Sequence, residues 1–212
     1  AKNFHKEQMR DEGVRYFEHC RKVVMILIKF GPSMPDEIIV ALLHDIYEDQ
    51  FVPRGMIRHL FGPGVNEVIK ALSHEKPFYK SHGRIVKTSQ DLKKYFNLIS
   101  RASSLVKRVK LADRLNNMET LEFCTKEKRI RKIKETRDYI LPIAGETDKR
   151  FYQAIKKLCD NAERKLKITA TASTPIPIAR RKLRTEAEAF GCACCAGATL
   201  AGMIHAASPP CP

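Results

Sequence analysis

The sequence predicts an all-α protein, and three observations support that fold class. Apolar residues recur at the three- and four-residue spacing of amphipathic helices through most of the chain. Prolines and glycines separate these stretches at positions where helices begin and end. No segment shows the sustained alternation of apolar and polar residues that is typical of strands. The 212 residues, 43% of them apolar, suffice for one domain with a substantial core.

The first two helices are predicted at residues 14–30 and 35–46. The first carries apolar side chains along one face and stops at a Gly-Pro pair. The second opens with a proline and two acidic residues. These suit a first helical turn, because proline lacks an N–H group and acidic side chains interact favourably with the helix dipole.

Shorter elements follow in the middle of the chain. A short helix is predicted at residues 53–62 and another at 65–72. Residues 74–88 contain histidine, proline, glycine and lysine, and we predict a loop there. The remaining helices are predicted at residues 89–101, 103–122, 127–140 and 142–166.

The composition changes after Lys167, so the helical domain is predicted to cover residues 1–168. Residues 169–212 contain few large apolar side chains, which is typical of a disordered tail or of non-native, read-through sequence. The Cys-Ala-Cys-Cys run at 192–195 is not expected to bind a metal, because no second Cys/His pair at finger spacing accompanies it.

The formal net charge of +15 favours a polyanionic partner: a nucleic acid, an anionic membrane surface or a phosphate-rich small molecule. We interpret the basic cluster at 126–134 as a solvated helix face. The richest apolar run, VVMILI at 23–28, is too short to cross a bilayer. The first residues are charged and seven cysteines give an odd count, so neither a secretory signal nor a disulfide framework is expected. The predicted compartment is the cytoplasm.

The stretch ALLHDIYED at 41–49 places ionisable side chains in an otherwise apolar run. Adjacent helical residues point about 100° apart, so His44 and Asp45 can both reach one point near a helix end. Imidazole nitrogens and carboxylate oxygens are ordinary ligands of divalent transition metals. His19 and Asp113 lie inside other predicted helices and could complete the set. Taken alone, each also fits a structural role, such as a hydrogen-bonded core histidine or an ion pair.

Glu48 and Asp49 lie four residues after His44 and Asp45. On a continuing helix they would line the same side as the proposed ligands, and on a loop they would still lie at the same mouth. A divalent metal lowers the pKa of water, and a nearby carboxylate can accept the proton. The alternative interpretation is a polar helix terminus.

The order His19, His44-Asp45, Asp113 resembles the H…HD…D signature of HD-domain metal phosphohydrolases, which are helical bundles. Five stretches are similar to the hydrolase domain of the RelA/SpoT family, over roughly residues 2–145. They are HKEQMRDEGVRYFEH (5–19), ALLHDIYED (41–49), FGPGVNEVI (61–69), VKLADRLNNMETL (109–121) and IKETRDYILPIA (133–144). Members of that family remove the 3′-pyrophosphate of guanosine tetra- or pentaphosphate with a bound Mn²⁺.

The resemblance assigns roles by position. The implied metal ligands are His19, His44, Asp45 and Asp113, and the implied catalytic pair is Glu48 and Asp49. The implied substrate-binding residues are Arg10, Tyr16, Asn117 and Thr120. The implied ion is Mn²⁺, with Zn²⁺ or Fe²⁺ as alternatives. A guanidinium such as that of Arg10 suits a polyphosphate, although a salt bridge to Asp11 or Glu12 explains that arginine equally well without the resemblance.

Three positions depart from the family pattern. Asp11 stands where a lysine usually follows the arginine, Cys20 replaces a proline, and Asn116 replaces a common histidine. The change at Asp11 removes a cation near the substrate and leaves the identity of the nucleotide open. No synthetase or regulatory domain follows, so we expect a stand-alone small alarmone hydrolase or a fragment of a longer protein.

The predicted function is metal-dependent hydrolysis of guanosine 3′,5′-bis(diphosphate), or its pentaphosphate form, to pyrophosphate and GDP or GTP. One alternative is an HD phosphohydrolase that acts on another phosphorylated nucleotide. A second is a non-enzymatic protein that binds nucleic acid or another polyanion. It is disfavoured because aromatic residues do not interleave with the basic ones and no base-reading motif appears. The expected partner is a phosphorylated guanine nucleotide; no membrane partner is expected, and the oligomeric state stays open.

Overall fold

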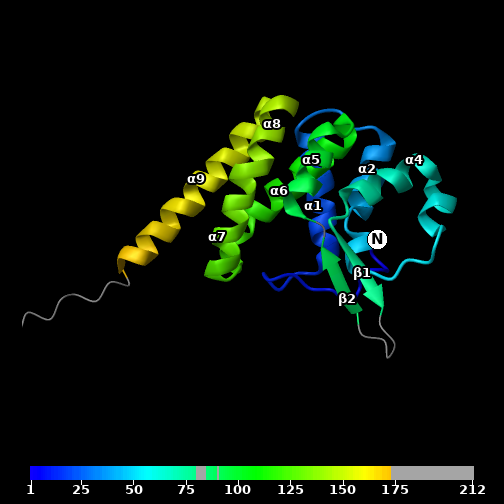
Figure 1. Ribbon diagram of the computed structural model, residues 1–212, viewed down its shortest axis with the longest axis horizontal. Coiled ribbons are helices and arrows are strands. Elements are labelled where there is room, and N and C mark those ends of the chain that lie inside the picture. Colours follow the sequence, from blue (N-terminus) through cyan, green and yellow to red (C-terminus); the bar gives the residue numbers. More distant parts are fainter. Residues whose placement is uncertain (80–84, 90, 173–212) are drawn as a thin grey trace, which may run out of the picture. The chain divides into compact units, whose positions relative to one another are not determined.

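The computed structural model describes residues 1–79, 85–89 and 91–172 (Figure 1). The predicted all-α class is confirmed, because helices make up most of this part of the chain and form one bundle. Most of the predicted tail at 169–212 lies outside the described residues, and so does the run at 192–195. The domain boundary at residue 168 therefore stays a prediction.

The chain enters the bundle through α1 (Tyr16–Lys29), α2 (Pro35–Leu43) and the short α3 (Ile46–Asp49). Helix α2 ends before the predicted residue 46, because Asp45 leaves the helical conformation at φ −99° and ψ 2°. The chain therefore bends at His44-Asp45 and restarts as α3. The sequence analysis considered a continuing helix or a loop for residues 48 and 49. They lie instead on a separate helical turn, α3.

The two helices predicted at 53–62 and 65–72 are the halves of one kinked helix, α4 (Met56–Leu72). The kink lies at Gly62, whose φ of +86° belongs to the left-handed region that favours glycine.

The prediction of a loop at 74–88 was wrong. Strands β1 (Glu75–Tyr79) and β2 (Ile85–Ser89) pair there as an antiparallel hairpin, in the register Glu75↔Ser89 to Tyr79↔Ile85. Proline lacks the N–H group that pairs in a strand ladder, so a proline within a stretch argues against a strand. Pro77 is therefore the reason why local propensity did not predict β1.

Side-chain caps mark the next three helices, which are α5 (Leu92–Arg101), α6 (Ser104–Glu119) and α7 (Lys126–Glu135), with a 3₁₀ turn, η1 (Leu121–Phe123), between the last two. Asp91 accepts from the Lys94 backbone N–H at 2.8 Å, and Ser103 and Thr125 occupy the same place in α6 and α7. Such caps satisfy backbone donors that have no partner in the first turn.

The chain continues through a π-helical segment, η2 (Thr136–Ile140), into α8 (Leu141–Thr147) and α9 (Lys149–Ala172). The prediction of one helix at 142–166 was wrong, because Asp148 adopts φ −158° and ψ 114° and separates α8 from α9. Its carboxylate accepts from the Arg150 backbone N–H at 2.9 Å, so Asp148 stabilises the start of a new helix.

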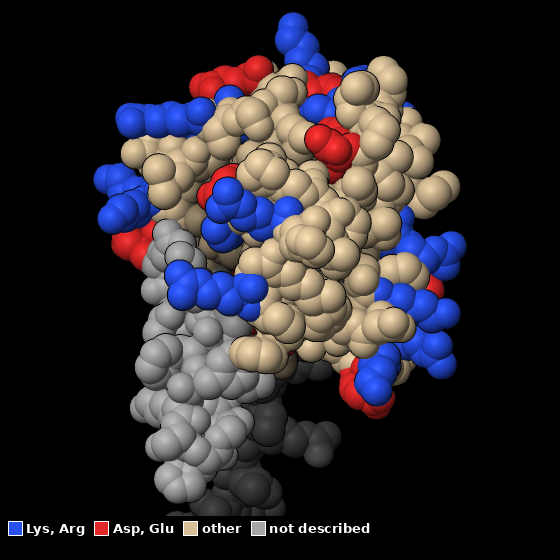
Figure 2. Space-filling model, turned by 90° about the vertical axis from the view of Figure 1, so that its right-hand side faces the viewer, with Lys and Arg blue, Asp and Glu red and all other residues tan. Residues whose placement is uncertain are grey.

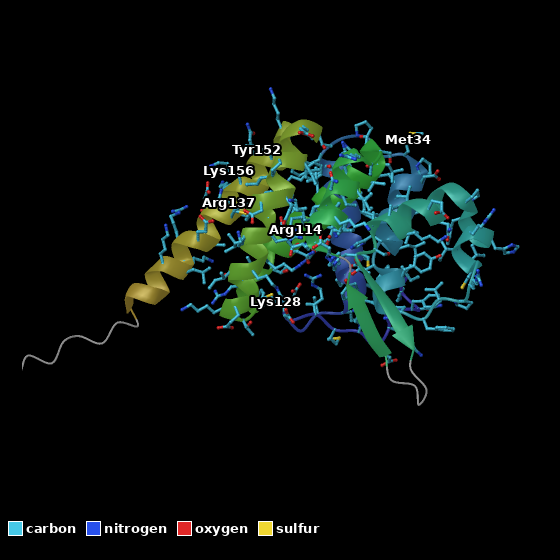
Figure 3. The ribbon with its side chains drawn as sticks, viewed as in Figure 1. Met34, Arg114, Lys128, Arg137, Tyr152 and Lys156 are labelled. Atoms are coloured by element: carbon cyan, nitrogen blue, oxygen red, sulfur yellow. The ribbon has the colours of Figure 1, made fainter. Side chains whose placement is uncertain are left out.

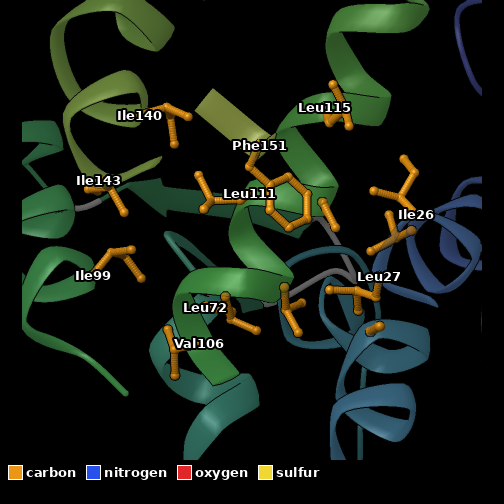
Figure 4. Packing of buried hydrophobic residues seen from close by; sticks show 14 of the residues in the cluster. Ile26, Leu27, Leu72, Ile99, Val106, Leu111, Leu115, Ile140, Ile143 and Phe151 are labelled. Carbon is orange, nitrogen blue, oxygen red and sulfur yellow. The ribbon is translucent and has the colours of Figure 1, made fainter. Parts of the chain in front are cut away.

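Helix α6 lies at the centre of the bundle and contacts α1, α2, α4, α5, α8 and α9. Its Val106, Leu111 and Leu115 belong to one buried cluster with Leu27 of α1 and Phe151 of α9 (Figure 4). Polar side chains on α6 are therefore held on a rigid support. In the part of the chain that the structure describes, no helix combines the length and apolar character needed to cross a membrane.

Candidate metal centre and adjoining cavity

Four side chains predicted as metal ligands converge from three parts of the bundle. His19 lies on α1, His44 and Asp45 at the bend after α2, and Asp113 on α6. Ligand atoms of the first three lie within 4.8 Å of one another. Asp113 Oδ1 lies 3.4 Å from His19 Nε2 and 3.8 Å from His44 Nε2. Ligands bound at about 2.1 Å from one ion lie roughly 3–4 Å apart, so the distances from Asp113 to the two imidazoles suit a shared cation, although Asp113 stands outside the group of three whose ligand atoms all lie within 4.8 Å of one another.

The two imidazole rings are oriented by their other nitrogens. His44 Nδ1 donates to the Ala41 carbonyl at 2.8 Å, and His19 Nδ1 donates to Asn116 Oδ1 at 2.7 Å. The Asn116 amide nitrogen in turn donates to Glu119, which fixes that orientation of the carboxamide. Because both Nδ1 atoms donate to oxygens, the two Nε2 atoms face each other across 3.2 Å and are the nitrogens that can ligate an ion once the rings are neutral. This is the arrangement in which neutral histidines ligate metals.

The carboxylates are also held by neighbours. Tyr16 donates its hydroxyl to Asp45 Oδ2. Asp113 Oδ1 accepts from the Asn117 amide at 2.5 Å, and Asp113 Oδ2 pairs with Lys110 Nζ at 3.1 Å. The carboxylate of Asp113 therefore faces the imidazoles and also forms an ion pair with a neighbouring lysine. Its geometry is compatible with both interpretations of this residue, a metal ligand and a member of an ion pair.

The electrostatics of this cluster favour a bound cation. Burial lowers the pKa of both imidazoles, but Asp45 and Asp113 outweigh it, so the pKa of His19 is raised and that of His44 is raised well above its ordinary value. Burial raises the pKa of each carboxylate, yet cationic neighbours hold both well below the usual range: chiefly His44 for Asp45 and Lys110 for Asp113. Two ionised carboxylates and two oriented imidazoles fit a divalent metal.

Glu48 and Asp49 point to different places. Glu48 Oε1 accepts from the His74 backbone N–H at 2.6 Å and lines a cavity beside the four converging residues. Burial, and then the charge of Asp45, raise the pKa of Glu48 to about 7. Asp49 does not line this cavity; its Oδ2 accepts from Gln8 Nε2 at 2.7 Å. The two carboxylates therefore have different surroundings: Glu48 faces the cavity, and Asp49 faces Gln8.

The predicted substrate-binding residues form one connected group. Arg10 Nη2 donates to Asn117 Oδ1 at 2.9 Å and to Thr120 Oγ1 at 3.1 Å. Its guanidinium carbon lies 5.9 Å from the centre of the Tyr16 ring. Arg10 Nε also bonds Glu12 at 3.3 Å, so the predicted salt bridge is present beside the contacts with α6.

The cavity has a volume of about 380 Å³ and is lined by side chains of both charges. The acidic ones include Asp45, Glu48 and Asp113, and the basic ones include Lys110, Arg131 and Lys132. The other lining residues are His74, Leu92, Tyr95, Phe96, Arg114, Asn117 and Glu135. Figure 3 shows Arg114 on α6 beside α7, where it bonds the carboxylate of Glu135.

The sequence analysis did not assign the four cationic residues that line the cavity, Lys110, Arg114, Arg131 and Lys132, to the site. Lys110 lies three residues before Asp113, so helical spacing alone could have placed it on the same face. Arg131 and Lys132 fall in the basic cluster interpreted as a solvated helix face; they belong to the part of α7 that lines the cavity. No local pattern distinguishes them from the other basic residues of this cluster.

Asp11, the departure from the family pattern, turns toward α7. Its Oδ2 lies 2.5 Å from Lys128 Nζ and 3.1 Å from Cys124 Sγ. Figure 3 shows Lys128 on α7. The carboxylate therefore has a cationic partner and is not among the residues that line the cavity. Cys20, at the second departure, is 1% exposed and packs in the core.

Comparisons with known proteins bear on the family and the fold of the chain. A family model described as HD domain matches residues 1–148. A probable GTP diphosphokinase RSH3 of Arabidopsis thaliana is 31% identical over 145 residues, which cover 68% of this chain and 20% of that protein. A GTP pyrophosphokinase rsh of Brucella melitensis is 37% identical over 141 residues, covering 66% of this chain and 18% of that protein. The chain thus spans about a fifth of these relatives.

A solved structure gives the fold comparison. It is described as a metazoan ortholog of SpoT that hydrolyses ppGpp and plays a role in starvation responses. It superposes with a TM-score of 0.63 at 21% identity, covering 78% of this chain and 91% of that one. At this identity the likeness establishes a shared fold.

Proposed function

Because the chain belongs to the HD domain family, we propose that it is a metal-dependent hydrolase that removes the 3′-pyrophosphate of guanosine 3′,5′-bis(diphosphate). One observation carries the proposal: two oriented imidazoles and two carboxylates converge beside a cavity that is lined by both carboxylates and cationic side chains. A polyphosphate whose reacting end needs a metal and whose other charges need cations suits such a cavity. The described activity of the solved neighbour supports the same substrate class.

The metal would be held by His19, His44, Asp45 and Asp113. Of the divalent ions that accept mixed nitrogen and oxygen ligands, we propose Mn²⁺, with Zn²⁺ or Fe²⁺ as alternatives. When bound, such an ion polarises a phosphoryl oxygen and lowers the pKa of water.

Glu48 and Asp49 would then orient the attacking water and accept its proton. A general base works best when its pKa lies near the operating pH, and a value of about 7 suits Glu48. Water attacks the phosphorus attached to ribose O3′, and the bond between that phosphorus and O3′ breaks. O3′ takes up a proton, which leaves GDP and pyrophosphate, or GTP and pyrophosphate from the pentaphosphate.

The nucleotide would be bound by Arg10, Tyr16, Asn117 and Thr120. Arg10 is already oriented by Asn117 and Thr120, so little side-chain freedom is lost when it contacts phosphate or base. Lys110, Arg131 and Lys132, which line the cavity, would neutralise further phosphate charge. On this substrate the protein would act in the stringent response, in the cytoplasm.

The test is an assay of the purified protein with guanosine tetraphosphate and Mn²⁺, in which we expect pyrophosphate and GDP in equal amounts. Asp45→Ala should abolish release, while Asp36→Ala, at the exposed start of α2, should not. If wild-type protein with confirmed bound metal releases no pyrophosphate, this substrate is wrong.

One observation favours a second candidate, an HD phosphohydrolase for another phosphorylated nucleotide. Asp11 stands where the family has a lysine, and it pairs with Lys128. Neither Asp11 nor Lys128 therefore presents a free charge to the substrate. A screen of 3′-phosphorylated adenine and guanine nucleotides separates the two candidates by kcat/KM.

The non-enzymatic polyanion-binding alternative has less support. On the face shown in Figure 2, Lys and Arg side chains stand in separate groups among uncharged surface. Binding of RNA or DNA that falls steeply with salt and survives Asp45→Ala would favour that alternative over an enzyme.

A further inference from the structure

A chain of hydrogen bonds joins the N-terminal segment to Asp49. Gln8 Nε2 donates to Asp49 Oδ2 at 2.7 Å. Gln8 Oε1 lies 2.7 Å from His5 Nδ1 and accepts from Gln50 Nε2 at 3.0 Å. A carboxylate can only accept and an amide nitrogen can only donate. One orientation of the Gln8 carboxamide therefore satisfies all three contacts, and His5 Nδ1 must carry a proton.

His5 is fixed in place by packing. Its side chain is 1% exposed, and its ring stacks on Tyr16 with centroids 4.8 Å apart. Its Nε2 is buried and has no hydrogen-bond partner among the described residues. A buried polar atom without a partner costs about 1–3 kcal/mol, which an apolar aromatic residue would avoid. Donation from Nδ1 to Gln8 is the contact that an apolar aromatic residue at this position would lose.

Asp49 needs such support because α3 is short. The helix ends at Asp49, and Gln50 is already extended at φ −128° and ψ 151°. A four-residue helix restrains its last side chain weakly. Small displacements of a catalytic group are costly, so a partner anchored outside α3 would have a measurable effect on turnover.

We propose that Gln8 and His5 are positioning residues that orient the carboxylate of Asp49 for hydrolysis. The inference rests on the proposed function, in which Asp49 belongs to the acidic pair. His5 orients Gln8, and Gln8 aims its amide N–H at Asp49. The same histidine stacks on Tyr16, whose hydroxyl donates to Asp45, so one segment supports both the acidic pair and the ligand set.

The first test separates turnover from binding. We expect Gln8→Leu to lower kcat about 10–100-fold with KM within about twofold and unchanged metal content, because only the orientation of Asp49 is lost. Gln8→Glu keeps the shape but removes the donor, and should be no better than Gln8→Leu. The matched control is Gln153→Leu on α9, where the glutamine is exposed.

The second test asks whether His5 acts through Gln8. His5→Phe keeps the stack but loses the donor, and should lower kcat by about 3–10-fold, while His5→Asn, which keeps an N–H near the Nδ1 position, should recover most of it. When Gln8→Leu is already present, adding His5→Phe should lower kcat no further, because His5 acts on Asp49 only through its hydrogen bond to Gln8. Thermal unfolding of each variant reports any loss of fold, and His59→Phe is the exposed control.

A third measurement needs no substrate. In ¹⁵N-labelled protein the Gln8 carboxamide N–H that bonds Asp49 should resonate downfield, and both Asp49→Asn and His5→Phe should move that signal. If wild type turns over and Gln8→Leu keeps kcat within twofold, the proposal is wrong while the proposed function stands. If wild type does not turn over, the proposed function fails, and unchanged Gln8 signals in His5→Phe would reject the orienting chain by themselves.

Discussion

Lys110 Nζ lies 3.1 Å from Asp113 Oδ2, and Oδ1 of the same carboxylate lies 3.4 Å from His19 Nε2. One carboxylate thus serves a buried ammonium on one side and the imidazole pair on the other. Burial lowers the pKa of Lys110. The neighbouring groups, Tyr95 and Asp113 first among them, outweigh burial, so the pKa of Lys110 is raised well above its usual value. The cluster is therefore balanced by Lys110 and by whatever cation the imidazoles face.

Lys110→Met should destabilise the metal-free protein, because it leaves Asp113 buried without its ammonium partner. Breaking a buried ion pair from one side costs about 3–5 kcal/mol. The loss should shrink when Mn²⁺ is present, since the metal then compensates the carboxylate. Urea unfolding in EDTA and in Mn²⁺ measures both values. Lys93→Met, at an exposed position of α5, should change neither; an equal loss for Lys110→Met in both buffers would contradict a shared role of Asp113.

Asn116→Ala should weaken metal binding although Asn116 is not a proposed ligand. Its Oδ1 accepts from His19 Nδ1 and so keeps the Nε2 lone pair directed at the shared point. Loss of such a partner typically lowers metal affinity about 10–100-fold. Titration with Mn²⁺, followed by calorimetry, gives the dissociation constant. Asn97→Ala, exposed on α5, serves as the control. Unchanged affinity in Asn116→Ala would show that His19 is oriented without this contact.

Glu48 should make the stability of the metal-free protein depend on pH. Its pKa is raised from 4.5 to about 7 by burial and by Asp45 and Asp49, against the opposing effects of Lys110 and the His74 N–H. Below pH 4.5 the carboxyl is protonated in both states and contributes nothing. As the pH rises from 4.5 to 7, the unfolded chain releases its proton and the folded protein does not, so stability falls.

The loss reaches about 3 kcal/mol above pH 7, taking 1.36 kcal/mol per pKa unit. Glu48→Gln removes the titration and keeps an oxygen for the His74 N–H. It should match wild type at pH 4.5 and exceed it by about that amount at pH 8. Urea unfolding in EDTA at the two pH values measures the difference. A variant that gains equally at both would show that Glu48 does not keep its proton in the fold.

The sequence predicted the helices and the family well because both depend on local patterns. Periodic apolar residues and Gly-Pro boundaries placed α1 and the start of α2, and the relatives confirm the resemblance to RelA/SpoT hydrolases. The order and spacing of the motifs also predicted that His19 and His44 converge. The structure agrees, because their Nε2 atoms lie 3.2 Å apart. The roles assigned to them remain proposals.

What the sequence did not predict depends on contacts between distant segments. The hairpin at β1 and β2 is hidden by Pro77 and forms through pairing across the strands. Arg131 has the same local character as the other basic residues of its cluster, and only the packing of α7 places it at the cavity. The link between Gln8 and Asp49 spans 41 residues, and no periodicity reports a contact of that kind.

Two glycines of α4 provide a matched test of the kink. A Cβ at Gly62 or Gly64 would meet nothing within 4 Å, so neither substitution causes a clash. Gly62 has φ +86° and ψ 168°, a combination that only glycine adopts readily and that costs another residue about 1–3 kcal/mol, whereas Gly64 lies beyond the kink in the helix and has no positive φ. Gly62→Ala should therefore lower the free energy of unfolding by about 1–3 kcal/mol, and Gly64→Ala should raise it by up to about 1 kcal/mol through helix propensity. Chemical denaturation of both variants measures the contrast, and equal effects would mean that α4 can straighten without cost.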